Sequence, residues 1–307
     1  MHYENLGILL TNQCTAECDI CCFSCSTKKN NWLSFEKVIE CIRMSKEVPE
    51  IKQIGFSGGE PFLDYSNLQK YIQEVDKLGI ASSVTSNAFW ADTYQSACEK
   101  LEILKQSGLK GVGFSYDEYH NKFVDINRIV NAILAAKTLD LEIVLQCVVD
   151  NQSHLGKIFD ILGPHLVDVS VGIIPCYRVG NAEHTIEESN LIREYSCRGK
   201  YCRKSGTFSI DCYGNVWPCC SPCVIQTALS VGNIYESSIS EAYERLQTNL
   251  FLRTLRNHGF DYFLNIADKV GIEYPRKIIS SCELCAILFS YQNYYKFLPF
   301  ILPNINN

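Results

Sequence analysis

Apolar stretches typical of buried strands alternate with amphipathic helical patterns through the first half of the chain. Helices are indicated where apolar residues recur three and four positions apart, as in the stripe Leu68, Tyr71, Ile72, Val75 and Leu78. We expect strands at residues 5–10, 51–56, 80–86, 111–116, 142–149 and 167–174. Helical patterns lie between them at residues 35–46, 68–78, 94–106, 126–134 and 154–162.

Strands that alternate with helices predict a parallel α/β sheet with right-handed crossovers. Because six units are fewer than those of a closed barrel, we expect an open, partial (β/α)6 barrel of the TIM type over residues 1–185. Active sites of such barrels lie at the C-terminal ends of the strands. The loops after residues 5–10 and 51–56 are therefore expected to meet on one face.

The pattern changes after about residue 181. Residues 183–194 are typical of a helix, and a hairpin is expected in residues 207–219 around Tyr213 and Gly214. Cysteines are frequent in this part of the chain. We expect residues 186–307 to form a small, cysteine-rich second domain.

The sequence contains 17 cysteines, and its net charge is −6. The negative charge argues against general affinity for nucleic acid, and no apolar run is long enough to span a bilayer. The first residues lack the basic region and cleavage site of a signal peptide. An odd number of cysteines without an export signal favours metal or redox chemistry over disulfides. We therefore expect a cytoplasmic protein that binds neither nucleic acid nor membrane.

The sequence CTAECDIC places Cys14, Cys18 and Cys21 in a CxxxCxxC motif directly after the first strand. Three thiolates bind three irons of a [4Fe–4S] cluster and leave the fourth iron open to a chelating molecule. The alternative is a structural zinc loop, which takes four ligands, with Cys22 or Cys25 as the fourth.

The sequence GGEP follows the second strand and consists of Gly58, Gly59, Glu60 and Pro61. Glycines permit close approach of a ligand to the backbone, and Glu60 offers a carboxylate. Beside an open cluster, this loop suits an amino-acid ligand.

Together, these two motifs and the strand–helix alternation resemble the radical SAM superfamily. The resemblance implies that the three cysteines hold a [4Fe–4S] cluster whose open iron binds S-adenosylmethionine (SAM). It also implies that the GGEP loop binds the amino group of SAM, and that cleavage of SAM yields a 5′-deoxyadenosyl radical. The chain departs from the usual pattern at Ile20, where an aromatic residue commonly precedes the third cysteine.

The resemblance further suggests SAM contacts from polar residues at or near later strand ends. These candidates are Ser86, Asn87, Ser115, Gln146 and Arg178. The alternative for each is an ordinary polar residue in a loop.

Four downstream cysteines resemble the short twitch extension of radical SAM enzymes, which holds one auxiliary [4Fe–4S] cluster. This set is Cys202, Cys219, Cys282 and Cys285, and it brings the expected total to two [4Fe–4S] clusters. The chain has too few downstream cysteines for the two-cluster SPASM arrangement. One of Cys197, Cys212 and Cys220 can replace a ligand in this set. The alternative to an auxiliary cluster is a zinc ribbon, because four cysteines also suit zinc.

The overall layout most resembles the radical SAM peptide epimerases of epipeptide biosynthesis. In that family a thiol returns a hydrogen atom to the substrate, a role that falls here on Cys223, with Cys220 as its competitor. The resemblance implies an isomerase that converts L-residues, Val or Ile, of a ribosomally synthesised precursor peptide to D-residues. It also implies an external electron donor of the flavodoxin or ferredoxin type.

Two other functions remain open at this point. The same hydrogen abstraction serves enzymes that form thioether or carbon–carbon crosslinks or that dehydrogenate a peptide. The non-enzymatic alternative is a zinc-binding interaction module.

Overall fold

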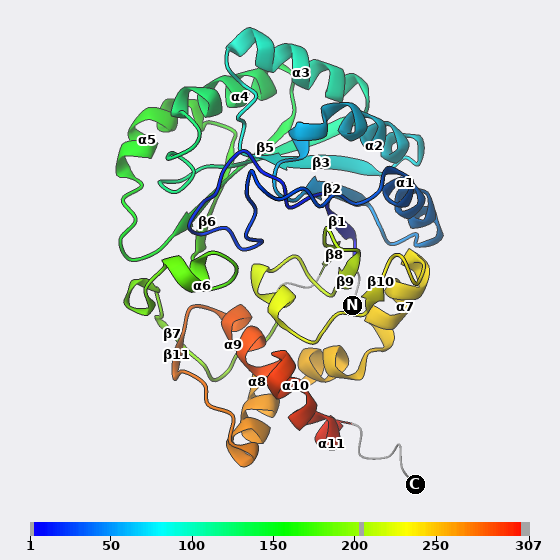
Figure 1. The fold of residues 1–307 in the computed structure, drawn as a ribbon, viewed down its shortest axis with the longest axis vertical. Coiled ribbons are helices and arrows are strands. Elements are labelled where there is room, and N and C mark those ends of the chain that lie inside the picture. The colour runs from blue at the N-terminus through cyan, green and yellow to red at the C-terminus, as the bar shows by residue number, and fades with distance from the viewer. Residues whose placement is uncertain (1–2, 203–205, 302–307) are drawn as a thin grey trace.

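The computed structural model describes residues 3–202 and 206–301, and most of its strands belong to one curved sheet (Figure 1). Six consecutive strands run parallel to one another in chain order. They are β1 (Asn5–Leu9), β2 (Gln53–Ser57), β3 (Ala81–Ser86), β4 (Leu109–Ser115), β5 (Glu142–Val149) and β6 (Ser170–Pro175). The six predicted strands and the partial barrel are confirmed, with small shifts at the strand ends.

Helices follow the first five strands and form an arc around the outside of the sheet (Figure 1). They are α1 (Phe35–Met44), α2 (Tyr65–Lys77), α3 (Tyr94–Gln106), α4 (Ile126–Thr138) and α5 (Gly156–Leu162). Short 3₁₀ turns accompany them at η1 (Ser45–Glu47), η2 (Pro61–Asp64) and η3 (Gly163–His165).

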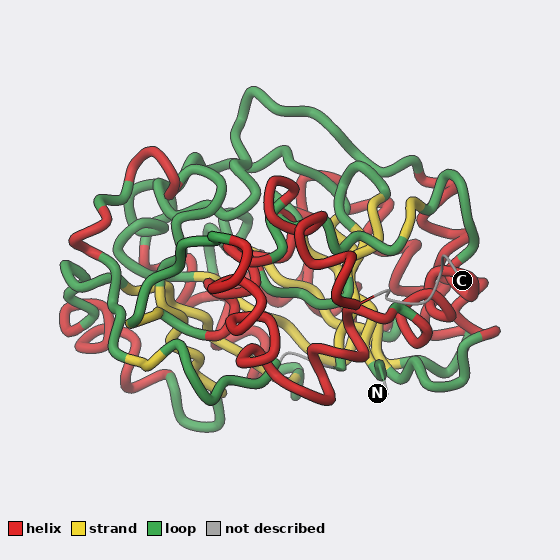
Figure 2. Tube along the Cα trace, turned by 90° about the horizontal axis from the view of Figure 1, so that it is seen from below, coloured by secondary structure: helices red, strands yellow, loops and turns green. Residues whose placement is uncertain are grey.

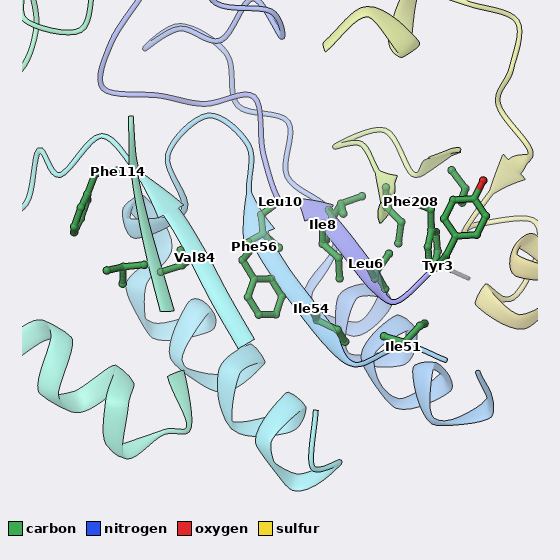
Figure 3. Packing of buried hydrophobic residues seen from close by; sticks show 14 of the residues in the cluster. Tyr3, Leu6, Ile8, Leu10, Ile51, Ile54, Phe56, Val84, Phe114 and Phe208 are labelled. Atoms are coloured by element: carbon green, nitrogen blue, oxygen red, sulfur yellow. The ribbon is translucent and has the colours of Figure 1, made fainter. Parts of the chain in front are cut away.

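Alternate side chains of each strand fill the space between the sheet and these helices. On β1 and β2, Leu6, Ile8 and Ile54 are fully buried, while their neighbours in sequence are only partly covered. Figure 3 shows these side chains packed with Phe56 and Val84 on the helix-facing side of the strands. The residues between them face the inside of the barrel, because side chains alternate along a strand.

Three strands from the C-terminal part extend the same sheet beyond β1. Strand β8 (Thr207–Ile210) pairs with β1 in parallel, and β9 (Asn215–Trp217) and β10 (Gly232–Asn233) follow antiparallel. The predicted hairpin is confirmed, and its turn contains Gly214 with φ +87°. A separate small sheet joins β7 (Tyr195–Ser196) to β11 (Lys277–Ile278).

The remaining helices lie on the side of the molecule opposite α3 and α4 (Figure 1). They are α6 (Ala182–Thr185), α7 (Ile239–Thr248), α8 (Leu250–Val270), α9 (Ser281–Leu288), α10 (Tyr291–Tyr294) and α11 (Leu298–Ile301). The 3₁₀ turns here are η4 (Glu188–Asn190), η5 (Pro222–Gln226) and η6 (Tyr295–Phe297). Figure 2 shows that long loops gather on one side of the strands. Within residues 3–202 and 206–301, no helix has the length and apolar character needed to cross a bilayer.

The helix predicted over residues 183–194 is wrong. Only the short α6 and η4 form there, joined by irregular backbone. Ile186 and Leu191 both pack into the same buried group, although residues five positions apart point in different directions on a helix. Irregular backbone allows both side chains to contact that group.

Candidate active site

The CxxxCxxC motif lies in the long loop between β1 and α1, which crosses the concave side of the strand arc (Figure 1). The backbone N–H of Cys14 donates to Ser26 O at 3.0 Å, and that of Cys21 donates to Cys18 O at 3.0 Å. All three cysteines of the motif pack into one buried group, together with Cys25 and Cys176. We call this set the first cysteine group.

The chemistry of these thiols fits an iron–sulfur cluster. Burial raises the pKa of Cys14 to about 12 and raises the pKa of Cys18 even further. A buried thiolate is stable only beside a cation, so three cysteines in one buried group suit the irons of a cluster. Hydrogen bonding from Cys25 lowers the pKa of Cys21, and the Cys25 backbone N–H lies 3.2 Å from Cys21 Sγ. Such N–H bonds tune the potential of a cluster.

The two glycines of GGEP are needed because the backbone of the cysteine loop lies directly against them. A Cβ at Gly59 would lie 1.9 Å from Gln13 O, and one at Gly58 would lie 2.5 Å from Thr11 O. The N–H of Gly59 donates to Thr11 O at 2.6 Å. The close approach that the sequence suggested for a ligand is thus made here by the backbone preceding Cys14.

Glu60 turns its carboxylate inward and joins the ends of β2 and β3. It is fully buried and accepts hydrogen bonds from Phe62 N, Ser86 Oγ and Asn87 N at 3.1, 2.9 and 2.9 Å. Burial raises the pKa of the Glu60 carboxyl to about 7, against the lowering effect of these bonds. Pro61 begins η2, with Glu60 as its N-cap. These bonds occupy both carboxylate oxygens, so the backbone of the loop is better placed than the Glu60 side chain to bind a ligand.

Asn87 connects this network to the first cysteine group. Its side-chain amide donates to Thr15 Oγ1 at 3.1 Å and lies 3.7 Å from Cys14 Sγ. The structure therefore brings Cys14, Glu60, Ser86 and Asn87 together.

The other predicted SAM contacts lie in two places. Ser115 and Gln146 are partners on the adjacent strands β4 and β5, and both are partly exposed. Arg178 instead pairs with Glu188 Oε2 at 3.0 Å and donates to Glu183 O at 2.5 Å. Binding of SAM by Arg178 would require its guanidinium to leave Glu188.

Asp117 and His120 form a pair beside Cys21. Neither residue is among the predicted site residues. The buried Asp117 carboxylate accepts from Val148 N at 2.9 Å and lies 2.9 Å from His120 Nδ1. Burial alone would lower the pKa of His120, but Asp117 and Cys21 outweigh it and raise that pKa. The sequence offered only an i, i+3 spacing of the two residues in a loop, which is a weak signal.

The four predicted auxiliary-cluster cysteines lie close to one another. Burial, followed by the charges of Cys219, Cys202 and Cys282, raises the pKa of Cys285. Cys282 and Cys285 lie on α9, and Cys219 follows β9. We call these four residues the second cysteine group.

The three cysteines that were considered as replacement ligands of the auxiliary cluster lie in other surroundings. Cys197 is buried in the main core, and Cys220 is exposed. Cys212 has its pKa raised to about 11 by burial and by Asp211, and Lys29 is also near it. In the described part of the chain, no three His, Cys, Asp or Glu side chains converge on a single metal position. A [4Fe–4S] cluster binds each cysteine to a different iron, so its ligands do not meet at one point.

Cys223 lies at the start of η5, in a small buried group with Val179 and Cys282. It is 1% exposed, and burial raises its pKa, so the thiol keeps its hydrogen at neutral pH. A cavity of about 290 Å³ adjoins it. The cavity has an apolar part that includes Ile279 and a charged part lined by Arg178, Arg193, Glu188 and Glu283.

Two family models match the chain, one over most of the barrel and one over the part that follows it. Residues 8–149 match the radical SAM superfamily, and residues 202–269 match SPASM, an iron–sulfur cluster-binding domain. The chain thus carries a radical SAM domain followed by an iron–sulfur cluster-binding domain, and the cofactors of these domains are SAM and [4Fe–4S] clusters. These matches overturn the alternative of a zinc-binding interaction module.

One curated relative matches almost the full length of the chain. It is the "Putative peptide biosynthesis protein YydG" of Bacillus subtilis (strain 168), 29% identical over 297 residues, with 94% of this chain and 93% of the relative covered.

Solved structures share the fold. One is native anSMEcpe with bound AdoMet and Cp18Cys peptide, with a TM-score of 0.57 and 17% identity, covering 97% of this chain and 96% of that one. Another is BtrN in complex with AdoMet and 2-DOIA, with a TM-score of 0.51 and 14% identity, covering 85% of this chain and 89% of that one.

Proposed function

We propose that the protein is a radical SAM peptide epimerase, which converts L-residues of a ribosomally synthesised precursor peptide to D-residues. The observation that carries this proposal is the place of Cys223. Its buried thiol retains a hydrogen atom and adjoins a cavity beside the second cysteine group. A peptide substrate is supported by the name of the relative YydG. Val and Ile are the proposed target residues.

When bound at the first cysteine group, SAM and its cluster supply the radical that removes a hydrogen atom from Cα. Cys14, Cys18 and Cys21 would hold that cluster, and the backbone of Gly58 and Gly59 fixes the loop against them. The Cα radical is planar and has no handedness. Cys223 then donates its hydrogen atom from the opposite face, which sets the D-configuration.

The second cysteine group is proposed to hold one auxiliary [4Fe–4S] cluster. Thiolates of Cys202, Cys219, Cys282 and Cys285 would complete its four ligands. Electrons would come from an external donor of the flavodoxin or ferredoxin type. The proposed setting is the reducing cytoplasm, where free thiols persist.

The experiment is incubation of the reduced protein with SAM and the peptide encoded beside its gene, in D₂O. Chiral amino-acid analysis should find D-Val or D-Ile with one solvent deuterium at Cα. Apart from that deuterium, the mass of the peptide should not change. A crosslinking or dehydrogenating enzyme would instead lower the mass, and that result would refute the proposal.

Replacement of Cys223 tests the donor directly. We expect Cys223→Ala to reduce D-residue formation at least 100-fold while SAM cleavage continues. Cys220→Ala is the matched control, because Cys220 is exposed and three positions away; it should epimerise normally. Normal epimerisation by Cys223→Ala would refute the donor assignment.

A further inference from the structure

Tyr177 packs against two buried clusters that contain cysteines. It follows β6 in the chain and is partly buried. Its side chain packs against the buried cluster that includes the first cysteine group. It also packs against the small buried group formed by Val179, Cys223 and Cys282. Tyr177 therefore lies next to the cluster that holds the proposed hydrogen donor, Cys223, and the auxiliary-cluster residue Cys282.

The phenol hydroxyl of Tyr177 is held by the helix that carries two auxiliary-cluster cysteines. Its oxygen lies 2.7 Å from Ser280 Oγ. Ser280 is the N-cap of α9, and its hydroxyl accepts a hydrogen bond from Cys282 N at 3.0 Å. Tyr177 also lines the cavity that Cys223 lines. The hydroxyl thus has a fixed position between α9 and the cavity.

The proposed epimerisation leaves Cys223 as a thiyl radical after each turnover. The thiol must regain one hydrogen atom before the next peptide can react. Cys223 is 1% exposed, so a reducing protein has no direct access to its sulfur. A side chain inside the protein that lines the same cavity is in a position to pass the hydrogen atom on.

We propose that Tyr177 returns the hydrogen atom to Cys223, a relay that rests on the proposed epimerase function. The O–H bond of Tyr177 breaks, the S–H bond of Cys223 forms, and Tyr177 becomes a neutral phenoxyl radical. Tyr177 then takes one electron from the reduced auxiliary cluster and one proton from solvent through the cavity. An auxiliary cluster held by Cys202, Cys219, Cys282 and Cys285 would supply that electron, which the flavodoxin- or ferredoxin-type donor would replace.

The chemistry of the two side chains suits this exchange. A phenolic O–H bond and a thiol S–H bond have similar strengths, so a hydrogen atom moves between them at little cost in free energy. A tyrosine hydroxyl is protonated at neutral pH, with an ordinary pKa of about 10. Fixing the hydroxyl at Ser280 limits the motion needed for transfer.

The test compares Tyr177→Phe with the wild-type holoenzyme over one and many turnovers. We expect Tyr177→Phe to form about one D-residue per enzyme and then to slow at least tenfold. Tyr65→Phe is the control, because Tyr65 is also partly buried and its hydroxyl donates to Lys100 O at 2.6 Å, in a different part of the molecule. It should turn over like the wild type. Iron and sulfide content establishes that each variant has folded and loaded its clusters.

Two readouts are independent of product formation. A spin trap should label Cys223 at least tenfold more in Tyr177→Phe, as measured by mass spectrometry of the digested protein. Placing 3,5-difluorotyrosine at position 177 should add fluorine splitting to a freeze-quenched phenoxyl EPR signal. Equal multiple turnover and equal labelling in Tyr177→Phe would overturn the relay and leave the epimerase intact. Absence of D-residues in the first turnover of the wild type would instead refute the epimerase.

Discussion

At the residue scale, the contact between the cysteine loop and the GGEP loop is made possible by the lack of a side chain at Gly59. We expect Gly59→Ala to push the cysteine loop away, because its Cβ would lie 1.9 Å from Gln13 O. The free energy of unfolding should fall by about 3 kcal/mol, as in severe overpacking. Iron bound at the first cysteine group should be lost at the same time.

Thermal unfolding and iron analysis measure both effects. Gly156→Ala is the control, because Gly156 is the first residue of α5 and a Cβ there meets no atom within 4 Å. Gly59→Ala with wild-type stability and iron content would contradict the contact.

The buried Glu60 makes a contribution to stability that depends on pH. Its pKa rises from 4.5 in the unfolded chain to about 7 in the folded protein, so the folded state binds the extra proton between these values. The contribution of Glu60 to stability is therefore largest at low pH and falls as pH rises through about 7. Glu60→Gln removes this dependence.

Melting temperatures of wild type and Glu60→Gln, measured between about pH 5.5 and 8, test this sign. The advantage of the wild type should shrink as the pH rises. An advantage that grows with pH would show that the carboxylate is stabilised rather than penalised by its site.

At the element scale, helix α9 is anchored by an ion pair. Glu283 lies between Cys282 and Cys285 and accepts from Ile279 N and from Arg193 Nε, both at 2.7 Å. Both side chains of the pair are largely covered, with 23% of Arg193 and 10% of Glu283 exposed. The pair therefore holds the first turn of α9 against the segment before β7.

We expect Glu283→Gln to lower the free energy of unfolding by about 2 kcal/mol, because it leaves Arg193 with a weaker partner in a largely covered site. The iron content should fall toward that of one cluster, while the SAM-responsive EPR signal persists. Glu188→Gln is the control, since the Glu188 side chain is 57% exposed and such pairs contribute about 0–1 kcal/mol. Equal losses in the two variants would refute the anchoring role.

Elements set by local pattern could be predicted from the sequence, and elements set by distant partners could not. The six parallel strands follow from alternation of apolar runs, and the hairpin follows from Gly214 in its turn. The cysteine motif alone indicated Cys14, Cys18 and Cys21 of the first cysteine group. The irregular path of residues 183–194 depends on a buried group built from other segments.

The directions in which the site side chains point could not be predicted from the sequence either. Glu60 turns toward Ser86 and Asn87 because buried N–H and O–H donors there need an acceptor. Arg178 turns toward Glu188, ten residues further along the chain. Neither partner follows from the motif in which the residue lies.

At the scale of the whole molecule, the radical SAM domain and the cysteine-rich part share one sheet and one core. β8 pairs with β1, and Phe208 of β8 packs near Tyr3 and Leu6 in the same hydrophobic cluster (Figure 3). This junction fixes the C-terminal part against the barrel. It is consistent with Tyr177 packing against both the buried cluster that includes the first cysteine group and the cluster of Val179, Cys223 and Cys282.

Cys14, Cys18 and Cys21 are proposed to hold a cluster with an iron open to SAM. The most direct measurement is EPR spectroscopy of the anaerobically isolated, dithionite-reduced protein with and without SAM, for the wild type and for a variant with all three cysteines changed to alanine. Cys98→Ala, in α3, serves as the control. The wild type and the control should show a cluster signal that shifts on addition of SAM. The triple variant should keep only a signal that SAM does not change, whereas a SAM-responsive signal in that variant would contradict the account.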